Sequence, residues 1–175
     1  IGSMGDDTPS AVLSDKYRPL SHFFRQNFSQ VTNPPIDSLR EHRVMSLKTR
    51  FGNLKNLLDQ TSAQIDIITL ESPVVSNGQF AAMKDAFGDQ VSEISCLFPV
   101  GTDDNVLRKE LERIRYDAEQ AVRAGAAHII LTDQGIDAAT VGMPMILATS
   151  AVHSHLTRKG LRTFCSLNVR SAECI

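Results

Sequence analysis

Four short apolar runs alternate with three helix-length segments between residues 65 and 169, and this order constrains the fold more than any other feature of the sequence. The runs are rich in β-branched residues and lie at Ile65–Leu70, Val91–Phe98, Ala127–Thr132 and Leu161–Val169. Strands that follow one another through a helix lie parallel, because the chain has to cross back before it pairs again. The order therefore predicts an α/β fold with a mainly parallel four-stranded sheet and crossover helices. The near-continuous apolar runs predict helices on both faces.

The segment Asp103–Ala124 carries the clearest helix pattern. Its apolar residues recur at steps of four, three, four and three: Leu107, Leu111, Ile114, Ala118 and Ala121. This spacing places them on one helix face. We expect Thr102 to cap the helix and Gly125 to end it.

Two further helices are predicted between the runs. Ser76 or Asn77 is a suitable cap for a helix that ends at Gly88. The other is Pro144–Lys159, since proline suits the first position of a helix.

The first 64 residues read as an N-terminal loop and helical arm, and residues 65–175 as the α/β part. We expect one helix at Leu20–Gln30 and another at Ile36–Ser46, separated by the Pro34–Pro35 pair, which helices do not continue through. Leu39 and Val44 are candidate core positions of the second helix. Residues 48–63 are predicted to be mainly loop. Because no helix follows the last strand to cover it, we expect the α/β part to continue beyond residue 175.

Composition excludes several classes of protein. The chain has 18 Lys and Arg against 20 Asp and Glu, a formal net charge of −2. It lacks the basic patch of a nucleic-acid binder. Its longest nearly apolar run, residues 142–152, is about half of a membrane span. The first residues carry Asp6 and Asp7 and lack the basic and apolar regions of a signal peptide. These features predict a cytoplasmic protein that contacts neither nucleic acid nor membrane.

The sequence offers little chemistry of its own, and we predict no catalytic, cofactor-binding or metal-binding residue in it. There is no G-x-G-x-x-G, no Walker A and no G-x-S-x-G motif. Cys96, Cys165 and Cys174 lack the spacing of a metal site and read as reduced thiols.

The histidines also favour structural roles. His153 and His155 are two residues apart on a predicted helix, so one is expected to face the core and the other solvent. A zinc-binding pair on a helix would be four residues apart. His128 is expected to be a hydrogen-bonded structural residue.

One loop could still bind a ligand. Thr132, Asp133, Gln134 and Gly135 follow a predicted strand, where open parallel sheets place their ligands. An autonomous small-molecule-binding module that uses this loop is therefore one hypothesis, a simple turn is another, and a free-standing enzyme is a third.

A series of segments resembles the central domain of the large (alpha) subunit of glutamate synthase. They are Ile1–Pro9, Gln30–Asp37, Leu39–Glu41, Val44–Leu47, Leu70–Pro73, Ile130–Gly135, and the stretch from Pro144 through Ala151–Leu156 to Gly160–Arg162. The resemblance runs nearly end to end in this order, and residues 30–37 are its most specific part.

The resemblance implies a larger oxidoreductase that acts on CH–NH2 donors and makes glutamate from glutamine and 2-oxoglutarate, a route of ammonia assimilation. An amidotransferase domain would release ammonia, and a later domain with FMN and a 3Fe-4S cluster would use it. Electrons would come from an NADPH- and FAD-containing small subunit or from ferredoxin. The central domain would join the two sites without being catalytic itself.

The resemblance also implies that the domain lines an internal ammonia tunnel. The positions that match the family's tunnel constriction are Met4, Asp6 and Thr32. Met4 is a flexible apolar gate candidate, and Thr32 offers a hydroxyl beside the stiff Pro34. Asp6 stands where the family usually carries Asn.

Overall fold

The computed structural model describes Leu20, Phe24, residues 36–52, 58–59, 65, 67–101 and 105–173. The chain divides into two compact units, Ile1–Ser46 and Leu47–Ile175. This division does not test the boundary expected between residues 64 and 65, so that boundary stays a prediction. The expected helix at residues 20–30 lies outside the described residues except for two positions.

Residues 36–46 of the first unit form one helical turn, α1, at Glu41–Val44. The Asp37 carboxylate precedes it and accepts hydrogen bonds from the backbone N–H groups of Leu39 and Arg40. The eleven-residue helix expected here is therefore wrong. Leu39 and Val44 are 83% and 57% exposed, so they are not core residues of this unit. Charged or polar side chains at four successive positions, 40–43, leave the turn without an apolar stripe.

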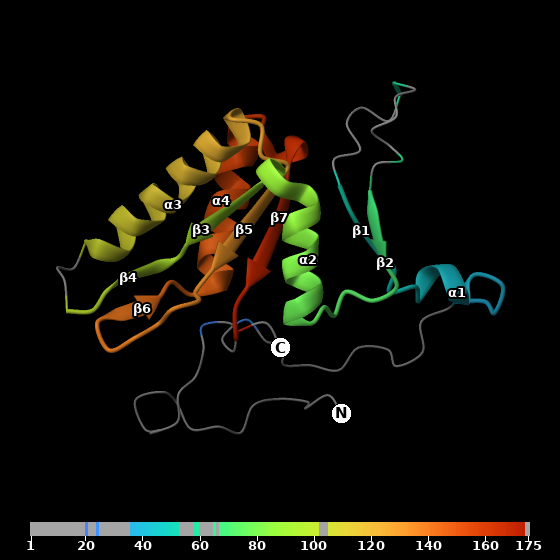
Figure 1. Ribbon diagram of the computed structural model, residues 1–175, viewed down its shortest axis with the longest axis horizontal. Coiled ribbons are helices and arrows are strands. Elements are labelled where there is room, and N and C mark those ends of the chain that lie inside the picture. The colour runs from blue at the N-terminus through green and yellow to red at the C-terminus, as the bar shows by residue number, and fades with distance from the viewer. Residues whose placement is uncertain are drawn as a thin grey trace. The chain divides into compact units, whose positions relative to one another are not determined.

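The second unit contains the α/β fold, shown in Figure 1. Its helices are α2 (Asn77–Phe87), α3 (Val106–Arg123) and α4 (Met145–Arg158), with short 3-10 turns at Gly88–Gln90 and Arg162–Phe164. Its strands are β1 (Thr49–Phe51), β2 (Ile68–Leu70), β3 (Val91–Ser95), β4 (Leu97–Pro99), β5 (His128–Thr132), β6 (Thr140–Gly142) and β7 (Ser166–Arg170). The predicted α/β class is confirmed.

The parallel sheet has three strands in the order β3-β5-β7, rather than four. The first predicted strand appears as β2, but it pairs antiparallel with β1 in a separate ribbon. β1 arises within a stretch expected to be loop, where Thr49 and Phe51 have the β-branched and aromatic side chains that favour strands.

The second predicted strand, residues 91–98, breaks at Cys96. The Cys96 N–H donates to the Thr132 carbonyl, and the Cys96 carbonyl accepts from the Met143 N–H, each at 2.8 Å. The chain thus leaves β5 at this residue and pairs antiparallel with β6 as strand β4. The apolar run is continuous in sequence, but its two parts, β3 and β4, belong to different sheets.

The helix predictions in this unit hold with one exception. α2 has a capping box, in which the Ser76 hydroxyl accepts from the Gln79 N–H while the Gln79 side chain accepts from the Ser76 N–H. Gly125, at φ 101°, follows the end of α3 as expected. The N-cap of α3 is Asn105 rather than Thr102, so the helix starts later than predicted.

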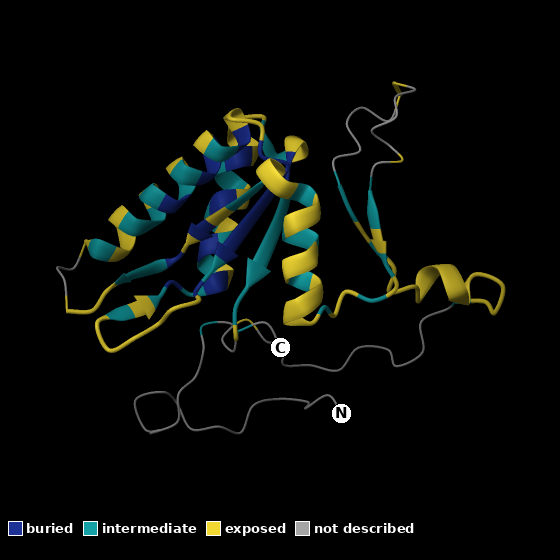
Figure 2. Cartoon of the chain, viewed as in Figure 1, coloured by how far each residue is buried: buried dark blue, intermediate teal, exposed yellow. Residues whose placement is uncertain are grey.

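The core lies between α3, α4 and one face of the sheet, where the buried residues gather in Figure 2. Its fully or nearly fully buried members come from these three layers: Ile94, Ile129, Leu131, Ile114, Ala118, Val122, Ala148, Val152 and Leu156. The predicted apolar face of α3 is confirmed at its centre, while Leu107 at its first turn is 40% exposed.

The opposite face of the sheet lies toward α2, so a helix lies on each face as predicted, but this face is less apolar than the first. α2 has no buried residue. Residues in register on this face include Glu93, Ile130 and Asn168, because alternate residues of a strand point to the same side. Of these three strands, only the central strand β5 has three successive apolar residues, Ile129–Leu131.

Candidate functional site

The predicted ligand loop follows β5 at the carboxyl edge of the parallel sheet. Asp133 is 8% exposed, and its Oδ2 accepts a 2.5 Å hydrogen bond from the Ser171 hydroxyl. The Gln134 N–H donates to the Thr132 hydroxyl oxygen, and Gly135 adopts φ 94°. The carboxylate of this loop, Asp133, is therefore hydrogen-bonded within the domain.

The N-terminus of α4 lies at the same edge and is also occupied from within. The Met145 N–H donates to Glu173 Oε2 at 2.8 Å, and the Glu173 N–H donates to the Ser171 hydroxyl at 3.0 Å. A carboxylate so placed complements the positive end of the helix dipole. It stands where the phosphate of a nucleotide or flavin would bind, so this position does not fit such a group.

The two described cysteines do not fit the iron–sulfur cluster that the resemblance implies for the larger enzyme. Cys96 and Cys165 are both buried. Burial raises the pKa of the Cys96 thiol to about 11 and also raises the pKa of Cys165. Cluster ligands are thiolates, which these surroundings disfavour. Within the described ranges, no three His, Cys, Asp or Glu side chains lie together as a metal site.

The two helix histidines separate as predicted. His155 Nε2 lies 2.6 Å from Glu119 Oε2 in a part-buried pair, while His153 is exposed and its Nδ1 accepts from the Arg162 side chain. Glu119 also accepts two hydrogen bonds from Arg123, which, with the His155 bond, lower the pKa of its carboxyl. This cluster joins α3 to α4 and is structural.

His128 departs from the expected hydrogen-bonded role. It is 3% exposed, and its Nε2 has no hydrogen-bond partner within the described part of the chain. Its ring stacks on Phe87, with the ring centroids 4.0 Å apart. Burial lowers the pKa of the imidazole, so the ring is neutral near pH 7.

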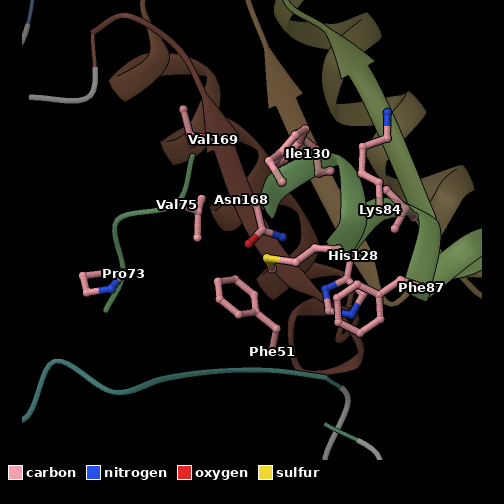
Figure 3. Close-up of a pocket in the computed structure, with 12 residues that line it drawn as sticks. Phe51, Pro73, Val75, Lys84, Phe87, His128, Ile130, Asn168 and Val169 are labelled. Carbon is pink, nitrogen blue, oxygen red and sulfur yellow. The ribbon is translucent and has the colours of Figure 1, made fainter. Parts of the chain in front are cut away.

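The His128 ring belongs to the wall of a cavity of about 170 Å³ between α2, the sheet and β1 (Figure 3). Apolar side chains dominate the wall, and they come from three separate elements: Phe51 of β1, Phe80, Met83 and Phe87 of α2, and Ile130 of β5. We call this the α2 pocket. Sequence reasoning missed it, although the alternation of Ser166–Arg170 signals a sheet face with polar residues.

The polar side chains around the α2 pocket other than His128 have partners. Asn168 Nδ2 donates to the Ile129 carbonyl at 3.3 Å. Lys84 Nζ lies 2.7 Å from Glu93 Oε2. The Arg170 guanidinium lies over the Phe80 ring, 4.9 Å from its centroid.

The predicted tunnel residues Met4, Asp6 and Thr32 lie outside the described residues. Their roles stay predictions. None of the helices that the structure describes is long and apolar enough to cross a membrane.

The glutamate synthase central domain family model matches residues 1–175. The chain belongs to this family. It is 62% identical over 173 residues to a glutamate synthase [NADPH] large chain of Azospirillum brasilense, covering 99% of this chain and 11% of that protein. It is 43% identical to ferredoxin-dependent glutamate synthase 2 of a Synechocystis strain, with 98% and 11% covered.

A glutamate synthase [NADH] of Saccharomyces cerevisiae is 36% identical over 177 residues, which are 99% of this chain and 8% of that protein. The chain therefore spans about a tenth of the length of the curated relatives it matches. The resemblance noted in the sequence is confirmed at the level of the family.

Proposed function

We propose that this domain connects the glutamine amidotransferase domain of a glutamate synthase to the FMN domain and lines the ammonia tunnel between them. The observation that carries the proposal is the match to the central domain family over all 175 residues, with 62% identity to a large chain nine times longer. The whole enzyme would make glutamate from glutamine and 2-oxoglutarate. FMN and the iron–sulfur cluster, carried elsewhere in that enzyme, would supply the reducing electrons.

The described structure supports a connecting role. The groups that could bind a ligand at the carboxyl edge of the sheet, Asp133 and Glu173, are held by Ser171 and by the first turn of α4. The fully buried core between α3, α4 and the sheet gives a rigid body on which flanking domains can be positioned. This favours a scaffold over the alternative of an autonomous binding module.

The names of the relatives bear on the electron source. They specify NADPH, NADH or ferredoxin, and the same domain occurs in all three kinds of enzyme. We infer that this domain does not select the electron donor. That choice would lie in other parts of the enzyme or in its small subunit.

The tunnel role assigns different tasks to the three predicted residues. Ammonia reacts as a nucleophile only when neutral, so its route has to exclude bulk water and still offer polar contacts. Met4 would act as an apolar gate, and the Thr32 hydroxyl would donate to or accept from passing ammonia. Asp6 would add a carboxylate where the family usually has an amide.

Replacing Thr32 by Val in the full-length enzyme tests this assignment. The change keeps the side-chain shape and removes the hydroxyl. We expect glutamine-dependent glutamate synthesis to fall, and the ratio of glutamine hydrolysed to 2-oxoglutarate consumed to rise above one. Both products are measured in one reaction mixture.

A Thr32→Val enzyme that folds normally and keeps the two activities matched would overturn the tunnel role of Thr32. In that case Thr32 would only end the predicted first helix before the two prolines. Thr69→Val makes the same change at an exposed position of β2, outside the matching tunnel segments, and is the control that should keep the ratio at one.

A further inference from the structure

The α2 pocket holds a buried polar atom that the described chain does not satisfy. His128 is 3% exposed, and its Nε2 lacks a partner in the described residues. Native proteins satisfy nearly all such atoms. The stacking on Phe87 fixes the ring, so the nitrogen cannot turn to solvent without losing that contact. Among the polar side chains of the pocket wall, His128 thus presents a buried nitrogen at a fixed place beside apolar neighbours (Figure 3).

The size and lining of the pocket suit one aromatic ring. Its volume is about 170 Å³, and a protein cavity of about 150 Å³ is large enough to bind benzene. Phe51, Phe80 and Phe87 line it from two different elements. Aromatic rings favour edge-to-face or offset contacts with such neighbours.

The apolar wall and the contacts already made by the charged side chains near the pocket favour a neutral occupant. Lys84 is the cation on the lining, and it is paired with Glu93 at 2.7 Å. Arg170 lies over Phe80 and 4.0 Å from the same glutamate. A carboxylate such as glutamate or 2-oxoglutarate would have to displace one of these contacts and lose its water. We therefore expect a neutral occupant, with a group that can donate to or accept from an imidazole nitrogen.

The surroundings of the pocket favour a polypeptide occupant over a free small molecule. Pro73 on the rim is exposed, the adjacent Val74 is 82% exposed, and α2 has no buried residue. A small molecule would fill the pocket but leave this apolar border in water. A protein segment would cover both, and about nine tenths of the relatives' length lies outside this chain.

We propose that the α2 pocket receives a tyrosine or tryptophan side chain from a part of the full-length polypeptide outside these 175 residues, with its polar edge bonded to His128 Nε2. Both side chains combine a ring with a hydroxyl or N–H, and both are enriched at protein interfaces. This inference rests on the proposed connecting role, since it names how the connector holds a neighbouring domain.

Site-specific photo-cross-linking in the full-length enzyme tests the proposal. p-Benzoylphenylalanine replaces Val75, a half-buried residue of the pocket wall. We expect an intramolecular cross-link, mapped by mass spectrometry, to a segment outside residues 1–175 that carries a tyrosine or tryptophan. His128→Phe keeps the stacked ring and removes the nitrogen. It should lower the cross-link yield at least about threefold, the effect of losing one ordinary hydrogen bond.

A matched control is His153→Phe on the exposed side of α4, which should leave the yield unchanged. A cross-link to a residue within 1–175, to a small molecule, or to no product would overturn the proposal. So would a full yield in His128→Phe. The cross-link yield is measured independently of the product ratio in Thr32→Val. A failed cross-link therefore does not contradict the tunnel role. An unchanged product ratio does not contradict the proposed occupant of the pocket.

Discussion

The two faces of the β3-β5-β7 sheet are built from the same strands but differ in composition and cover. On the side of α3 and α4, the register places Ile94 beside Leu131 and Leu131 beside Val169, and the first two are 4% and 0% exposed. On the side of α2, the same register places Glu93 beside Ile130 and Ile130 beside Asn168. Three strands thus give one closed core and one face with charged residues and a pocket.

This difference teaches how a domain can be both stable and incomplete. The α3/α4 face supplies the burial that folding needs, because the apolar area removed from water there is continuous. The α2 face contributes less, and its helix stays half-exposed. A domain that works inside a longer polypeptide can leave such a face for its neighbours to cover.

Leu131→Ala against Met83→Ala is the sharpest mutational test of the two faces. Leu131 is fully buried under α3 and α4, so its truncation should cost about 2–5 kcal/mol through lost burial and a cavity. Met83, half-buried in α2, should cost about 1 kcal/mol. Urea titrations of the 175-residue chain measure both. Equal losses would show that the faces contribute alike.

The α2 capping box gives a smaller expected effect. Ser76→Ala removes the acceptor for the Gln79 N–H and should cost about 1 kcal/mol. Ser150→Ala, an exposed position within α4, is the control and should be neutral or slightly stabilising, since alanine favours helices. Helicity and urea midpoint report both changes. An unchanged urea midpoint in Ser76→Ala would mean that contacts with the sheet stabilise α2 more than its cap does.

His128 gives the smallest expected effect, a dependence of stability on pH. Burial lowers the pKa of His128 in the folded chain, so on acidification the unfolded chain takes up the proton first. Stability should therefore fall as the pH drops through about 6.5, the ordinary histidine value. His128→Phe should reduce the loss of urea midpoint between about pH 7.5 and about pH 5.5. An unchanged loss in the variant would assign the pH dependence to other groups.

Residue patterns predict some parts of this fold well. The steps of three and four in α3 predict Ile114 and Ala118 as core residues, and both are fully buried. The apolar run at Ala127–Thr132 predicts a strand, and this strand is confirmed as β5. Ser76 predicts the start of α2, because its cap depends only on residues within one turn.

The remaining parts depend on contacts between residues distant in sequence. The break at Cys96 arises because its N–H bonds to Thr132 and its carbonyl to Met143, and no local signal marks it. The pairing of β2 with β1 likewise depends on tertiary contacts rather than on a local pattern. The α2 pocket needs three elements to meet, and the polar alternation of Ser166–Arg170 lies largely within a run predicted to be a strand from its apolar residues alone.

Hydrogen exchange tests most directly whether the α2 face is completed by the rest of the polypeptide. Amide protection is compared residue by residue between the 175-residue chain and the full-length enzyme. We expect α3 amides, including that of Ile114, to be protected to the same degree in both. The α2 amides from Phe80 to Phe87 should be at least about tenfold more protected in the full-length enzyme, as expected when a segment that opens locally gains a covering partner. Equal protection of α2 in the two proteins, or an equal gain across α2 and α3, would contradict the account.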